Sequence, residues 1–244
     1  MTIVTIKWGR RYPGSYVNIL RRHTRHYGLG DARFICFTDD ATGLDADIDV
    51  RPLPEIDLPE SRRWTFWRKL ALFDPRLGIT GPCLYLDLDI VLIGDLRPLM
   101  DGWNGNPRFI QTWVGPKTIR SGNYERINSS VMLYDGQSCG NVLTQFHANQ
   151  EGAFSRYSTD QGFIYEALAS HAEFFPRQLC VSFKKHCLAR FPLNFFLTPK
   201  APAGTCVVCF HGKPDPHEAA RGYMVGRLKY RCRPTPWIPR YDES

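Results

Sequence analysis

The chain has 244 residues and a hydrophobic fraction of 43%, which is enough apolar material for one large globular domain. Its aromatic content of 13% excludes a disordered chain, and no apolar run reaches the length of a membrane helix. The net charge of +7 favours anionic partners, such as nucleic acid, an acidic membrane face or phosphorylated small molecules.

The start of the chain and its cysteines bear on where the protein acts. Residues 1–14, MTIVTIKWGRRYPG, lack the hydrophobic region of a signal peptide, and we expect a cytoplasmic protein. The 8 cysteines are scattered and lie mostly in apolar contexts. Cys206 and Cys209 form a CxxC pair, but no second pair has the spacing of a zinc site. We therefore expect small core residues rather than disulfides, zinc ligands or redox groups.

The first part of the chain alternates between strand and helix patterns. Strands are predicted at residues 2–7, 32–38 and 83–87, and helices at residues 16–27 and 63–73. This alternation predicts an α/β fold with a mostly parallel sheet flanked by helices.

The second part of the chain is more mixed. Strands are predicted at residues 108–114, 130–134 and 205–210, and helices at 140–149 and 159–169. We expect a single domain over residues 1–220, with a nucleotide-binding half (1–100) and an acceptor and sugar half (101–220). Residues 221–244 form a basic, aromatic tail that we expect to wrap the surface.

The most informative segment is CLYLDLDIVLIGDLRPL, residues 83–99, in which Asp87 and Asp89 interrupt an apolar run. On an extended strand these two side chains face the same side, and two close carboxylates repel by ~4 kcal/mol at an effective dielectric near 20. Either one aspartate is protonated or a divalent cation lies between them. The plainer alternative is a strand end with two solvated aspartates.

The segment YLDLDIVLIGDLRPL resembles the strand and DxD segment of glycosyltransferases of the glycogenin and bacterial lipopolysaccharide galactosyltransferase type. The resemblance extends over residues 2–217 and implies the single Rossmann-like domain called the GT-A fold. It implies an enzyme that moves a hexosyl group from a nucleoside diphosphate sugar, expected to be a UDP-sugar, to an acceptor hydroxyl. A Mn²⁺ or Mg²⁺ cofactor would be held by Asp87, which also meets the donor, and by Asp89.

Two further stretches match the family in the same order. INSSVMLYD, residues 127–135, resembles its asparagine-bearing strand, so that Asn128 would contact the donor sugar. A turn asparagine before a core strand is the alternative. STDQGFIYEAL, residues 158–168, resembles its DQ motif, which would place Asp160 and Gln161 beside the anomeric carbon. A capped helix start explains the same residues, and both interpretations can hold.

CFHGKPDPH, residues 209–217, resembles the family's histidine, glycine and lysine-proline segment but departs from its spacing. The interpretation that keeps the chemistry takes His211 as a metal ligand, with Gly212 and Lys213 meeting the diphosphate. At strict register the family's histidine, lysine and tryptophan are replaced by Cys209, Asp215 and His217.

Three positions fit the family by topology only. Lys69 matches a basic residue that holds the active-site carboxylates or the donor, although a solvated helix face explains it equally well. Tyr12, in the loop after the first strand, would stack on the base. Asp39, after the second strand, would contact the nucleotide.

The resemblance implies retention of the anomeric configuration, in bacterial glycan or lipopolysaccharide synthesis. Retention by two displacements requires a nucleophile, for which Asp160 is the candidate, whereas a same-face mechanism requires none. The donor sugar, the base and the acceptor depend on loops such as residues 113–124, which carry no readable code.

The tail and the net charge leave other partners open. Basic and aromatic residues in 221–240 suit an anionic membrane face, which predicts peripheral contact with the inner membrane and a glycolipid or carbohydrate acceptor. They also suit single-stranded nucleic acid or a tail packed by its own aromatics. A degenerate nucleotide-sugar-binding protein, a metal-dependent phosphoryl-transfer enzyme and a non-catalytic nucleic-acid-binding protein are the competing functions. No recognised nucleic-acid motif is present, so we expect no nucleic-acid partner.

Overall fold

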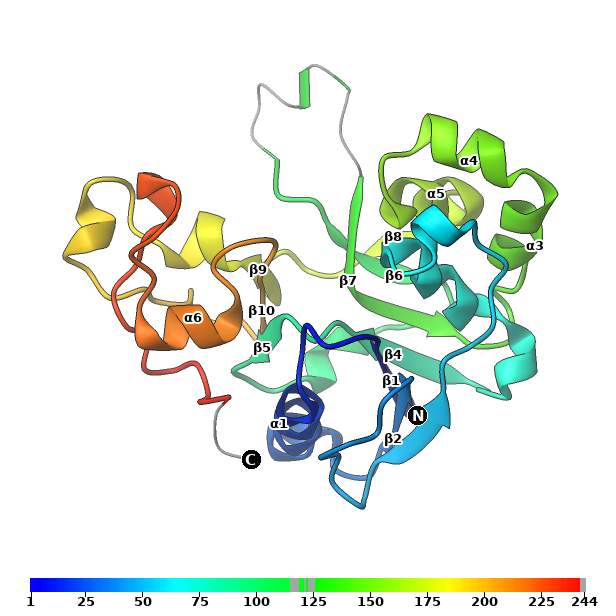
Figure 1. Cartoon of the computed structure of the whole chain (residues 1–244), viewed down its shortest axis with the longest axis horizontal. Coiled ribbons are helices and arrows are strands. Elements are labelled where there is room, and N and C mark those ends of the chain that lie inside the picture. The colour runs from blue at the N-terminus through cyan, green and yellow to red at the C-terminus, as the bar shows by residue number, and fades with distance from the viewer. Residues whose placement is uncertain (115–118, 121, 123–125, 242–244) are drawn as a thin grey trace.

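The main structural element is a mixed sheet through the centre of the molecule (Figure 1). The computed structural model describes residues 1–114, 119–120, 122 and 126–241. Within these residues the sheet has seven strands in the order β3-β2-β1-β4-β7-β6-β8. Its parallel part consists of β1 (Thr2–Lys7), β2 (Arg33–Thr38), β3 (Asp49–Pro52) and β4 (Pro82–Leu86). The predicted α/β fold with a mostly parallel sheet is thereby confirmed.

The other part of the sheet is antiparallel and irregular near the end of β4. β7 (Ile127–Asp135) runs antiparallel to β4 and to β6 (Arg108–Gln111), and β8 (Glu173–Phe174) pairs parallel with β6. The register of β6 and β7 shifts between Phe109 and Ile110, so that residues 129–131 have no partner on β6. A bulge of this kind redirects side chains, and it turns residues 128–130 toward a cavity.

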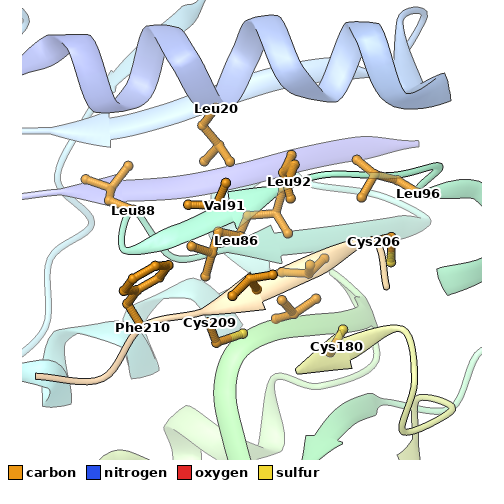
Figure 2. Close-up of a cluster of buried hydrophobic side chains, with 14 of the residues drawn as sticks. Leu20, Leu86, Leu88, Val91, Leu92, Leu96, Cys180, Cys206, Cys209 and Phe210 are labelled. Atoms are coloured by element: carbon orange, nitrogen blue, oxygen red, sulfur yellow. The ribbon is translucent and has the colours of Figure 1, made fainter. Parts of the chain in front are cut away.

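One face of the sheet is covered by α1 (Gly14–Thr24) and by a shorter sheet of β5 (Ile90–Leu92), β10 (Val207–Cys209) and β9 (Cys180–Ser182). Figure 2 shows the apolar core between them, with Leu20 of α1 above the strand that bears Val91 and Leu92. All 8 cysteines are buried and unpaired, as expected for small core residues.

The opposite face is covered by α3 (Asn141–Ala148), α5 (Asp160–Leu168) and the 3₁₀ segment Phe66–Phe73, beside α4 (Gln150–Arg156). Trp67 is fully buried there, stacked on Phe146 with ring centroids 5.7 Å apart. The helix predicted at residues 63–73 is therefore wrong in type, because residues 67–73 are buried by a 3₁₀ helix at Phe66–Phe73, preceded by a separate 3₁₀ turn at Glu60–Arg62.

The remaining short segments connect these layers. They are the π-helical turns Arg25–Leu29 and Phe183–Cys187, the helix α6 (Pro216–Arg221), and the 3₁₀ turns Pro75–Leu77, Arg97–Leu99, Leu193–Phe195 and Leu228–Tyr230. None of the helices in the described part of the chain combines the length and the apolar character that a membrane span requires.

The C-terminal segment is packed against the domain rather than lying loosely on it. Cys232, Ile238 and Tyr241 are buried in the same core as α1, and the ring of Tyr241 stacks on Tyr16 at 4.0 Å. The hydroxyl of Ser15 donates to the Tyr241 carbonyl at 3.0 Å. Much of the tail's aromatic content is thus used for packing. The expected division into halves at residue 100 stays a prediction.

Candidate active site

A cavity of about 730 Å³ opens at the carboxyl ends of β1 and β4. Six separate segments line it: residues 8–12, 64–66 with 69, 87–89, 128–130, 159–161 and 210–212. The edge of an open α/β sheet where strands end is the usual place for a ligand. Nearly all of the sequence-predicted site residues lie in these segments.

Asp87 and Asp89 follow β4 directly, but the strand does not continue through them. β4 ends at Leu86, residues 88 and 89 form a turn, and β5 begins at Ile90. The expected extended geometry is therefore wrong, although both carboxylates still line the cavity. Burial and the charge of Asp87, opposed by Lys69, raise the pKa of Asp89 to about 8. Asp89 therefore holds its proton more tightly than an ordinary aspartate does.

Lys69 is the centre of a buried hydrogen-bond network. Its amine donates to Asp87 Oδ2 at 3.1 Å, and to the carbonyl and the hydroxyl of Ser129 at 3.3 and 3.1 Å. The Ser129 hydroxyl donates in turn to Asp160 Oδ2 at 3.2 Å, and Tyr85 donates to Asp87 Oδ1. Burial lowers the pKa of Lys69, but the charges of Asp87, Asp160 and Asp89 outweigh it and raise that pKa above its ordinary value. Lys69 therefore stays charged and neutralises part of the acid cluster.

The bulge in β7 positions the amide side chains of the cavity. Gln161 Oε1 accepts from the backbone N–H of Ser129 at 3.0 Å, and Asn128 Oδ1 accepts from the backbone N–H of Ser130 at 3.1 Å. α5 begins at Asp160, with the Thr159 hydroxyl accepting from the Gln161 N–H as its N-cap. Asn128, Asp160 and Gln161 all line the cavity. A capped helix end and a sugar-contacting role remain compatible for them.

His211 lines the cavity from the C-terminal side. Its ring stacks on Trp113 at 5.9 Å, and its Nε2 lies 3.3 Å from the Ser182 hydroxyl. Its Nδ1 is buried without a hydrogen-bond partner in the described residues. Burial, with the charges of Lys184 and Lys185, lowers the pKa of His211 to about 4. The imidazole is neutral at physiological pH, as a metal ligand must be.

The side chains of the cavity are of the types that bind a divalent cation, but few of them lie close together. The carboxylates of Asp87 and Asp89, the second with a raised pKa, share one cavity with the neutral imidazole of His211, whose Nδ1 has no hydrogen-bond partner in the described residues. In the described residues, however, no three His, Cys, Asp or Glu side chains lie close enough to hold a metal ion. Ions such as Mg²⁺ are often bound by one or two carboxylates together with the phosphates of the substrate. Asp87 and Asp89 can supply the two carboxylates, so a third protein ligand is not required.

Lys213 and Asp39 are committed to other partners. The Lys213 amine pairs with Asp215 at 2.9 Å and with Glu218 at 2.7 Å at the start of α6. Both oxygens of Asp39 accept from the Gly9 N–H at 3.1 Å, which fixes the loop after β1. Neither residue is among the described residues that line the cavity, whereas Gly212 is. Their expected contacts with the diphosphate and the nucleotide stay predictions.

The loop after β1 also contributes cations and aromatic rings. Tyr12 lines the cavity as expected, and so do Arg10 and Arg11, whose role the sequence did not indicate. Arg11 donates to Asp215 at 3.1 Å, with its side chain 60% exposed. Trp64 and Phe66, 50% and 39% exposed, also line the cavity. The GRRYPG run could have pointed to these arginines, because paired cations beside a strand end suit a diphosphate. Most of the loop over residues 113–124 lies outside the described residues.

Comparison with known proteins bears on the fold. No protein-family model and no curated protein matches the chain significantly. An active-site mutant of LgtC matches with a TM-score of 0.62 at 14% identity, over 88% of this chain and 89% of that chain. The galactosyltransferase LgtC in complex with donor and acceptor sugar analogs matches with a TM-score of 0.60 at 14% identity, over 89% of each chain.

A second glycosyltransferase gives the same result. GlyE from Streptococcus pneumoniae TIGR4 matches with a TM-score of 0.63 at 14% identity, over 93% of this chain and 58% of that chain. At 14% sequence identity, the similarity to these structures shows a shared fold. The protein therefore has the fold of these glycosyltransferases, the GT-A fold that its sequence motifs indicated.

Proposed function

We propose that the protein is a metal-dependent glycosyltransferase that moves a sugar from a nucleoside diphosphate sugar to an acceptor hydroxyl. The observation that carries the proposal is the shared cavity. It brings the carboxylate pair at the end of β4 together with Asn128, Asp160 and Gln161, around the charged amine of Lys69. Three motif stretches of the sequence supply these acids and amides, and Lys69 comes from the segment before β4.

Asp87 and Asp89 would hold Mn²⁺ or Mg²⁺, with His211 as the candidate third ligand. When bound, the ion neutralises negative charge on the departing diphosphate. The chain supplies further positive charge from Lys69 and from the exposed guanidinium of Arg11. A diphosphate neutralised in this way leaves without a strong general acid.

The sugar would lie against Asn128 and Gln161, whose amide groups are held by backbone hydrogen bonds at the bulge. Preorganised polar groups of this kind hold a substrate with little loss of conformational entropy. Asp160 is 2% exposed and accepts from Ser129, so it is held rigidly beside the cavity. It would serve either as a nucleophile or as a group that orients the neighbouring polar side chains. Retention would follow from a double displacement with Asp160 as nucleophile, or from a same-face mechanism that needs no nucleophile.

The direct test is the variant Asp89→Asn, measured by Mn²⁺-dependent transfer or donor hydrolysis. We expect turnover to fall by at least about 100-fold because the cation loses a charged ligand. Asp101→Asn is the matched control, since Asp101 is exposed and lies outside the cavity lining. If Asp89→Asn transfers sugar as well as the parent does, the metal site is wrong.

A second candidate function follows from the ion pairs of Lys213. Because this lysine is held by Asp215 and Glu218, the protein could bind a nucleotide sugar without turning it over. Thermal stabilisation by nucleotide sugar and Mn²⁺ without any donor hydrolysis would support this binding function over the enzyme.

The same stabilisation measurement, applied to a panel of nucleotide sugars, identifies the donor. We propose a UDP-sugar donor, a carbohydrate or glycolipid acceptor, and a role in bacterial glycan or lipopolysaccharide synthesis on the cytoplasmic side. LgtC, whose fold this chain shares, is a galactosyltransferase that binds donor and acceptor sugar analogs. A larger shift with a purine nucleotide sugar would overturn the choice of uridine.

A further inference from the structure

The positive charge of the protein is concentrated in its C-terminal part. Residues 174–241 contain 12 lysines and arginines but only two acidic residues, whereas the rest of the chain has more acids than bases. The two acids, Asp215 and Glu218, are already paired with Arg11 and Lys213. The outer surface of this part is therefore cationic without interspersed carboxylates.

Exposed apolar side chains gather on the same part of the molecule. Phe196 and Leu197 are 71% and 52% exposed, and Val225 is 63% exposed. The other large apolar residues that are about half exposed here are Phe191, Leu193, Met224 and Leu228. Together these seven residues define the apolar tip. Monomeric proteins seldom leave so many neighbouring large apolar groups in water unless something covers them.

Two loops form the apolar tip, and hydrogen bonds join them. The backbone pairing of Tyr223 with Cys232 closes the loop 224–231. Asn194, 1% exposed, donates to the carbonyls of Leu228 and Arg231 at 2.9 and 2.8 Å, which fixes the loop 190–197 against it. In Figure 1 these yellow and red segments lie side by side, at the end of the molecule away from α3 and α4. The tip is a built surface rather than a frayed end.

Cations surround the apolar tip. Arg190 is the first residue of one loop, and Arg227 and Lys229 lie within the other. All three are exposed, and within the described residues none of them forms an ion pair. Long basic side chains beside exposed apolar groups match an anionic lipid surface, where the apolar groups enter the headgroup region and the cations meet the phosphates.

We propose that the apolar tip and its surrounding cations dock the protein on an anionic lipid bilayer. Of the basic tail, this surface uses only the loop 224–231, because Tyr223 and Ile238 are buried. Single-stranded nucleic acid is the weaker match, because base stacking needs exposed aromatic faces and most of the tip is aliphatic. A second copy of the chain is also weaker, because a two-fold contact would bring the same cations together.

The test is co-sedimentation of the whole chain with vesicles of phosphatidylcholine containing about 30% phosphatidylglycerol. We expect binding at about 0.1 M salt that falls severalfold at about 0.5 M, and little binding to phosphatidylcholine alone. Phe196→Ser/Val225→Ser and Arg227→Glu/Lys229→Glu should each weaken binding at least about tenfold. Val50→Ser, on the exposed edge strand β3, is the matched control and should bind as the parent does.

Several results would overturn the proposal. One is vesicle binding that ignores the serine pair, because the apolar tip would then play no part. Another is tight binding of single-stranded RNA that is lost in the glutamate pair but unaffected by the serine pair. A third is a dimer in solution that the serine pair dissociates, without vesicle binding. None of the substituted residues lines the cavity. A negative result for membrane docking therefore does not contradict the proposed transferase function, and loss of the transferase proposal does not contradict membrane docking.

Discussion

The two walls of the cavity differ in how their charges are satisfied. On the wall built from β4, β7 and α5, Lys69 joins Asp87, Ser129 and Asp160 in one buried network. On the second wall, built from the loop after β1 and residues 210–212, Arg11 forms an ion pair with Asp215. Lys213, just outside the residues that line the cavity, forms an ion pair with the same carboxylate, and both cationic side chains are more than half exposed. The first wall is preorganised before any ligand binds, whereas the second is held by solvent-exposed ion pairs, which under the proposed function would be exchanged for the diphosphate. Substitutions should therefore have large effects on the first wall and graded effects on the second.

The largest expected effect is that of Lys69→Met, which leaves the buried acids uncompensated. Breaking a buried ion pair from one side costs about 3–5 kcal/mol, so the free energy of unfolding should drop by that amount. Sugar transfer should fall by at least about 100-fold. Urea denaturation and a transfer assay measure the two losses. Unchanged stability would mean that the network of the first wall is not formed.

Arg11→Ala and Lys213→Ala compare the two cations of the second wall. We expect Arg11→Ala to reduce turnover by about 10–100-fold, because its exposed guanidinium lines the cavity and can meet the diphosphate. Lys213→Ala should change turnover by less than about threefold, as for an exposed ion pair. Steady-state kinetics with saturating Mn²⁺ measure both. The reverse order would return the diphosphate role to Lys213, as the family resemblance implies.

Ser129→Ala should have a smaller effect on the first wall. It removes the hydroxyl between Lys69 and Asp160 but leaves both charges in place. The loss of a hydrogen bond to a charged group costs about 1.5–3 kcal/mol. Ser130→Ala is the matched control, since the described structure assigns its hydroxyl no hydrogen bond. The free energy of unfolding, measured by urea denaturation, compares the two variants. An equal decrease in both would contradict the hydrogen-bond network of Lys69, Ser129 and Asp160.

The smallest expected effect is a pH dependence of stability from His211 in the metal-free protein. Its pKa falls to about 4 in the folded state, so between that value and its ordinary 6.5 the unfolded chain binds more protons. His211 therefore makes stability fall as the pH drops through this range. His211→Gln should reduce the difference in unfolding free energy between pH 7 and pH 4.5. An unchanged difference would show that the imidazole is not buried on the second wall.

The sequence predicted the first wall better than the second. Asp87, Asn128, Asp160 and Gln161 each lie at the end of a strand or the start of a helix, where local pattern fixes their position. Lys213 was predicted to face the diphosphate, but the capping of α6 places Asp215 and Glu218 beside it. The spacing of residues in the sequence does not show whether Lys213 pairs with these carboxylates or with a ligand. Tyr85 and Ser129 were missed because their hydrogen bonds join segments far apart in the chain.

The sequence by itself determined the order of the elements, the carboxylates at the end of a buried strand and the excess of charge. These features follow from local periodicity and composition, which each segment carries alone. Only the tertiary structure decided the end of β4 at Leu86, the packing of the C-terminal segment on α1 and the gathering of exposed apolar residues from two loops. Those outcomes depend on which surfaces meet and bury each other, because side-chain packing and charge pairing are properties of the assembled chain.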